Sequence, residues 1–92
     1  MKATAELQVV PVGAGVSVRN EITQVVEILN SYDFILETHA AGTNIEGDVD
    51  AVFAAVKQIH EVLHAKGVSR LLTYLKLETR TDKTPTLAGK KL

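Results

Sequence analysis

The fold of this chain is decided by the stretch Gly42-Thr43-Asn44-Ile45-Glu46-Gly47-Asp48. Two glycines bracket a short extended run, and a long helical pattern follows at once. Alternate side chains of an extended strand share a face. Asn44 and Glu46 are therefore predicted to point one way, and Thr43 and Ile45 the other. An amide and a carboxylate side by side on one face could hold a small nitrogen-bearing ligand.

Around this stretch the pattern predicts a hairpin and then a helix. One strand is predicted over Phe34–Thr38, a tight connection over Ala40–Gly42, and the next strand over Thr43–Gly47. Asp48 is the predicted N-cap of the helix, which ends where Lys66-Gly67 supplies a basic residue and a glycine. The apolar stripe predicted for this helix consists of Val49, Val52, Phe53, Val56, Ile59, His60 and Leu63.

The flanking segments supply two more strands and one more helix. Ala3–Val10 alternates apolar and polar side chains with the period of a half-buried strand. Pro11–Gly15 breaks that pattern, and Ser17 is the predicted N-cap of a helix that ends near Asn30. Leu71–Thr79 returns to period two, and residues 82–92 form a polar tail. The apolar positions of the first helix are Val18, Ile22, Val25, Val26 and Leu29.

The resulting order is strand, helix, strand, strand, helix, strand, in a single domain over residues 1–92. A ferredoxin-like βαββαβ fold of the α+β class satisfies this order best. Two right-handed crossovers then place both helices on one face of a four-stranded antiparallel sheet. In that topology the first and third strands are neighbours at the centre of the sheet.

The sheet face away from the helices is predicted to be rich in hydrogen-bonding groups. Glu6 and Glu46 are candidate cross-strand neighbours on it, and their like charges would favour a cationic or amino-substituted ligand between them. Three interpretations remain open: the face contacts water, packs against another subunit, or binds a ligand directly. The side chains predicted for this face are Glu6, Gln8, Glu37, His39, Asn44, Glu46, Tyr74 and Lys76.

Composition excludes several classes of protein. Ten Lys and Arg balance eleven Asp and Glu, and only two Phe, two Tyr and no Trp are present, which disfavours nucleic-acid binding. The absence of Cys excludes disulfides and thiolate chemistry. The first six residues carry no apolar signal core, so we expect a cytoplasmic protein that does not insert into membranes. A core this small leaves room for further burial between subunits, so we expect an oligomer.

Two short motifs resemble known functional patterns, one for zinc and one for phosphate. His60-Glu61-Val62-Leu63-His64 matches the H-E-x-x-H zinc pattern formally, but a third protein ligand is missing and His60 falls on the apolar stripe. We interpret His60 as a packing residue and His64 as a partner of the helix C-terminus. Gly13-Ala14-Gly15 could cradle a phosphate on backbone amides, yet it lacks the lysine of a P-loop and is better explained as a turn. The sequence therefore predicts no catalytic residue, no bound metal and no resident cofactor.

With these residues in view, the chain resembles the small thiamine-binding protein family. The Gly-Thr-x-x-Glu-Gly element at residues 42–47 is the most specific part of the likeness. The likeness extends over most of the chain, through Val10–Val18, Gly42–Asp48, His60–Leu63, Gly67–Arg70 and Lys76–Lys83.

The resemblance implies a ferredoxin-like fold, dimers joined into homotetramers, and binding of thiamine (vitamin B1) or its hydroxymethylpyrimidine part without catalysis. Such a protein would serve as a carrier, buffer or sensor. By position the resemblance carries over Thr43 and Glu46 as ligand-binding residues, with Ser17 as a further candidate. Gln8 and Asn44 are added by the sheet-face argument. Stacking on the pyrimidine would have to come from a neighbouring subunit or from the few rings available, which are Tyr32, Phe34, His39 and Tyr74.

Two other functions compete with this one. A regulatory or assembly module would use the open sheet face to bind a protein partner. An enzyme would rest on the zinc pattern alone.

Overall fold

The computed structural model of the protein describes residues 1–13 and 19–91. Within these residues the chain forms four strands, two α-helices and one short 3₁₀ helix. Their bounds are β1 Lys2–Pro11, α1 Arg19–Asn30, β2 Ile35–His39, β3 Gly42–Asp48, α2 Val49–Ala65, β4 Leu71–Glu78 and η1 Ala88–Lys90. The predicted strands agree with the observed ones to within one residue at each end. Ser17 and Val18, the predicted start of the first helix, lie outside the described residues.

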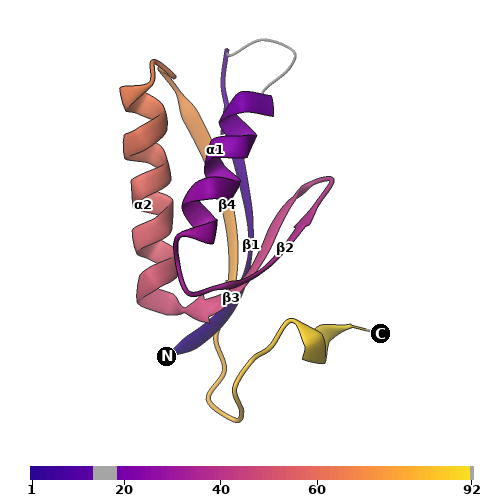
Figure 1. Cartoon of the computed structure of the whole chain (residues 1–92). Coiled ribbons are helices and arrows are strands. Elements are labelled where there is room, and N and C mark those ends of the chain that lie inside the picture. The colour runs from indigo at the N-terminus through magenta and orange to yellow at the C-terminus, as the bar shows by residue number, and fades with distance from the viewer. Residues whose placement is uncertain (14–18, 92) are drawn as a thin grey trace.

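The four strands form one antiparallel sheet in the order β2-β3-β1-β4. Both helices lie on the same side of it, and the C-terminal segment runs back on the other side (Figure 1). This is the predicted ferredoxin-like α+β arrangement, with β1 and β3 at the centre. No helix among the described residues is long and apolar enough to span a membrane.

Strand alternation builds the core between the sheet and the helices. β1 buries every second side chain from Ala3 to Val9, and Ile45 of β3 is 1% exposed beside them. α1 and α2 close this layer with side chains spaced three and four residues apart. The helix residues buried there are Val25, Leu29, Val52, Ala55, Ile59 and Leu63.

The second helix has the predicted ends. The Asp48 carboxylate accepts a hydrogen bond from the Asp50 N–H at 3.1 Å, and Gly67 follows the helix with a positive φ of 103°. One predicted core position is wrong, because Phe53 is exposed. The buried stripe passes through Val52 and Ile59, and the residue after Val52 is turned about 100° away from it.

Both glycines of β3 are required by close packing. A Cβ on Gly42 would lie 2.5 Å from the Leu7 carbonyl oxygen, and a Cβ on Gly47 would overlap the ring of Phe34. Phe34 also stacks on Tyr32 with a centroid separation of 5.2 Å. The glycines thus let the hairpin approach β1 at one end and an aromatic pair at the other.

Candidate functional site

The face of the sheet away from the helices carries two rows of polar side chains. In the first row, the cross-strand register places Glu37 opposite Asn44, Asn44 opposite Glu6, and Glu6 opposite Lys76. In the second row, Glu46 lies opposite Thr4 rather than opposite Glu6. The predicted pairing of Glu6 with Glu46 is therefore wrong, and the two carboxylates are diagonal neighbours. The membership of the face agrees with the prediction.

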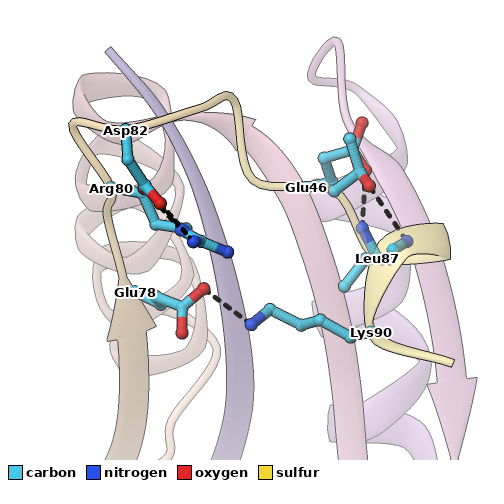
Figure 2. A network of polar contacts seen from close by, with 8 residues as sticks. Glu46, Glu78, Arg80, Asp82, Leu87 and Lys90 are labelled. Atoms are coloured by element: carbon cyan, nitrogen blue, oxygen red, sulfur yellow. Dashed lines mark hydrogen bonds and ion pairs between the residues drawn. The ribbon is translucent and has the colours of Figure 1, made fainter. Parts of the chain in front are cut away.

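This face is not open along its whole length, because the C-terminal segment crosses it (Figure 2). The Glu46 Oε1 atom accepts a hydrogen bond from the backbone N–H of Leu87 at 2.8 Å. Pro85 is buried, and Leu87 is only 8% exposed. The segment Pro85–Lys91, which we call the strap, therefore uses the Glu46 carboxylate as an anchor.

Two ion pairs hold the end of the strap. The Lys90 ammonium lies 2.6 Å from a carboxylate oxygen of Glu78 on β4, and the Lys91 ammonium lies 2.7 Å from one of Glu37 on β2. The hydrogen bond from Lys91 holds the pKa of the Glu37 carboxyl below its usual value, and Lys90 does the same for Glu78. The strap is thus tied to three different strands.

His39 orders the polar groups next to the strap. Its Nδ1 accepts a hydrogen bond from the Ala41 N–H at 3.2 Å, so in the neutral ring the proton is on Nε2. Nε2 lies 3.1 Å from Asn44 Oδ1 and 3.4 Å from a carboxylate oxygen of Glu6. Because Asn44 accepts through its oxygen, its NH₂ group is the donor, and a hydrogen bond from Asn44 also contributes to the lowered pKa of Glu37.

A cavity of about 560 Å³ lies between the strap and the sheet. Its floor is formed by the first polar row together with Thr4, and its roof by the strap. The lining residues include Thr4, Glu6, Asn44, Lys76, Leu87 and Lys90.

A second cavity, of about 440 Å³, lies on the helix side, where α1 meets β1 and the β2–β3 hairpin. Its walls are mostly apolar, and Thr43 adds a hydroxyl group. Thr43 is 5% exposed and lines this cavity. The apolar part of the lining is Leu7, Val9, Val10, Pro11, Ile22, Val25 and Val26.

Comparison with known families assigns this architecture. A family model described as "Thiamine-binding protein" matches residues 5–91. The chain belongs to the thiamine-binding protein family. A UPF0045 protein of Synechocystis is 43% identical over 90 residues, which cover 98% of this chain and 74% of the relative. A UPF0045 protein of Methanocaldococcus jannaschii is 36% identical over 89 residues, which cover 97% of this chain and 88% of that relative.

Solved structures agree with the family assignment. The crystal structure of the Methanocaldococcus jannaschii protein matches with a TM-score of 0.90 over 97% of this chain and 91% of that one, at 36% identity. A Thermotoga maritima protein, provisionally assigned to thiamine biosynthesis or salvage, matches with a TM-score of 0.86. That match covers 98% of this chain and 95% of the Thermotoga protein at 21% identity, which supports the fold alone.

The fold separates the two binding residues predicted from the family signature. Thr43 and Glu46 of the Gly-Thr-x-x-Glu-Gly element lie on opposite faces of β3, so no small molecule within one subunit can contact both side chains. Gln8 borders the helix-side cavity, although alternation along β1 directs its side chain to the polar face. Asn44 lines the cavity under the strap. Ser17 lies outside the described residues.

The aromatic rings are unevenly placed for stacking on a ligand. Tyr32 and Phe34 stack on each other, and Tyr74 is exposed on the polar face. His39 borders the helix-side cavity, but its ring contacts Asn44 and Glu6 on the polar face.

The two histidines of the zinc pattern have separate partners. His60 Nε2 is hydrogen-bonded to Thr73 Oγ1 at 2.6 Å, and His64 Nδ1–H donates to the Val68 carbonyl at 2.7 Å, just beyond the end of α2. Within residues 1–13 and 19–91, no group of three metal-binding side chains is clustered. These contacts match the packing and helix-end roles predicted for His60 and His64. Gly13 of the predicted phosphate-type turn has a φ of 80°, while residues 14 and 15 lie outside the described part.

Sequence reasoning missed the strap, which it treated only as a polar tail. Two signals were available: Pro85 and Leu87 are the apolar residues at alternate positions of that tail, and a pair of lysines follows them. These signals are weak because extended segments of such composition are common in solvent-exposed tails. Thr4 was also missed as a site residue, since its burial depends on the strap.

Proposed function

We propose that this protein binds thiamine or its hydroxymethylpyrimidine part, without catalysis, in the helix-side cavity. The observation that carries the proposal is a buried Thr43 hydroxyl facing an apolar cavity of about 440 Å³, in a chain that belongs to the thiamine-binding family. Small-molecule sites are typically cavities of this size with apolar walls and a few polar groups.

The chemistry of the cavity suits a flat heteroaromatic ring. Leu7, Val9 and Val25 supply aliphatic surface against which a pyrimidine can pack. The Thr43 hydroxyl can donate to a ring nitrogen or accept from the exocyclic amine.

The division of β3 into two faces separates the roles of the signature residues. We assign Thr43 to the ligand and Glu46 to the strap, because Glu46 already accepts a hydrogen bond from Leu87. A ligand that used both residues would have to lie between two subunits. Within one subunit the helix-side cavity needs only Thr43.

We further propose that the protein acts in the cytoplasm as a homo-oligomer, in the role of a carrier, buffer or sensor. Ile35, Leu72 and Tyr74 are large side chains that stay exposed on the polar face. Such apolar side chains on a sheet face are suited to packing between subunits. The alternative is a module that binds a different protein through this face, and the strap covers part of the surface that either kind of partner would use.

Isothermal titration calorimetry tests the binding proposal. Wild-type protein should release or absorb heat with thiamine or hydroxymethylpyrimidine. The Thr43→Val variant should lose about 1–2 kcal/mol of binding free energy, a roughly 5- to 30-fold weaker Kd. The matched control is Thr23→Val, because Thr23 is exposed on α1 and bonds only to the Arg19 carbonyl. No saturable heat with either ligand would refute the proposal.

A further inference from the structure

The cavity beneath the strap is not used by the proposed thiamine site. It has a volume of about 560 Å³ and lies on the other face of the sheet. The strap forms the roof of this cavity, and the Glu46–Leu87 hydrogen bond and the Lys90–Glu78 ion pair hold it there (Figure 2).

One buried polar residue lines this cavity. Thr4 is 4% exposed, and strand alternation directs its side chain to the polar face, where it forms part of the cavity wall. Its hydroxyl adds a neutral group to that wall that can act as donor or acceptor.

Two charged side chains around the cavity, one acidic and one basic, take no part in the ion pairs of the strap. Lys90 and Lys91 are paired with Glu78 and Glu37, as described above. Glu6 and Lys76 remain, directly opposite each other on β1 and β4. In the described part of the chain, Lys76 makes no ion pair, and Glu6 has only the ring of His39 at 3.4 Å. The floor thus presents one negative and one positive group side by side.

We propose that this cavity binds a small zwitterion, a molecule with one ammonium and one acid group separated by two or three carbons. The ammonium lies on the Glu6 carboxylate and the acid group on the Lys76 ammonium. Neighbouring strands are about 4.8 Å apart, which matches the reach of such a molecule. A ligand with a single charge would satisfy one of the two groups and leave the other unpaired.

Neutral groups then orient the ligand. The NH₂ group of Asn44, which is a hydrogen-bond donor to Glu37, lines the cavity. The Thr4 hydroxyl is available as donor or acceptor. Access requires the strap to lift, and its two ion pairs are exposed enough for this to be reversible.

NMR titration of ¹⁵N-labelled full-length protein with β-alanine tests this site. Saturable amide shifts are expected at Thr4, Glu6, Asn44 and Leu87. Propionate and propylammonium, titrated separately at the same ionic strength, should produce no saturable shifts at these residues. These two controls separate a zwitterion site from general ion binding.

Three variants complete the test. Glu6→Gln and Lys76→Met should each weaken β-alanine binding by at least about tenfold, since each removes one of two charge-assisted contacts. Lys57→Met is the matched control, because Lys57 is exposed on α2. Absence of saturable shifts, an equal response to propionate and propylammonium, or unchanged affinity in both Glu6→Gln and Lys76→Met would overturn the proposal.

Discussion

The two faces of the central sheet are covered in different ways. The helix side is closed by α1 and α2, whose apolar stripes bury Ile45 and its neighbours to within a few per cent of complete burial. The other side is partly covered by the strap, which is held by one hydrogen bond, two exposed ion pairs and the burial of two small apolar contacts at Pro85 and Leu87. Hydrophobic burial is strong and non-directional, whereas exposed ion pairs contribute little. One face therefore fixes the fold, and the other is available for reversible contacts.

The largest expected effect is on the free energy of unfolding, and it should differ between the two faces of the sheet. Ile45→Ala, on the helix side, should lower the free energy of unfolding by about 2–5 kcal/mol, because it leaves a cavity in the core. Ile35→Ala is the matched control on the other face, where the side chain is 57% exposed, and should cost less than about 1 kcal/mol. Urea denaturation followed by circular dichroism measures both. Similar losses in the two variants would contradict the comparison.

A second variant tests the close packing of the β2–β3 hairpin. Gly47→Ala should destabilise the protein by about 1–3 kcal/mol, since the added methyl overlaps the ring of Phe34. Combining it with Phe34→Leu should give a smaller total loss than the sum of the two single variants. Denaturant unfolding of the double-mutant cycle checks this, and strict additivity would show that the overlap is not the cause.

The strap side should give a smaller effect. Glu46→Ala removes the acceptor for the Leu87 N–H and should cost about 1 kcal/mol of stability. Amide hydrogen exchange at Leu87 should become faster, while the Kd for hydroxymethylpyrimidine stays within about twofold of wild type. A loss of ligand affinity as large as that of Thr43→Val would instead assign Glu46 to the ligand.

The smallest effect concerns the ion pairs at the end of the strap. The pKa of Glu37 is lowered by Lys91, so the pair favours the folded strap above the carboxyl's ordinary titration range and is lost as pH falls through the lowered pKa. In Lys91→Met, the pKa of Glu37 should rise toward its ordinary value, while that of Glu78 should be unchanged. NMR titration of the side-chain carboxyl carbons follows both groups, and an unmoved Glu37 would show that the pair does not form in solution.

The sequence predicted the helix side well and the strap side poorly, for physical reasons. Alternation from Ala3 to Val9 and the spacing from Val52 to Leu63 record burial directly, because a buried face must be apolar at a fixed period. The same alternation put Thr43 and Glu46 on opposite faces. The strap has no period, and its hydrogen bond to Glu46 joins residues 41 positions apart through a backbone N–H that any residue other than proline would supply. The family resemblance supplied the signature residues but could not say which face the ligand occupies.

Methyl-resolved NMR titration with hydroxymethylpyrimidine tests most directly whether the helix-side cavity holds the ligand. If it does, the methyl groups of Val25, Val26 and Ile22, which line that cavity, should show saturable shifts, and the Leu87 methyls of the strap should not move. Saturable shifts at Leu87 with Val25 and Val26 unchanged would contradict it.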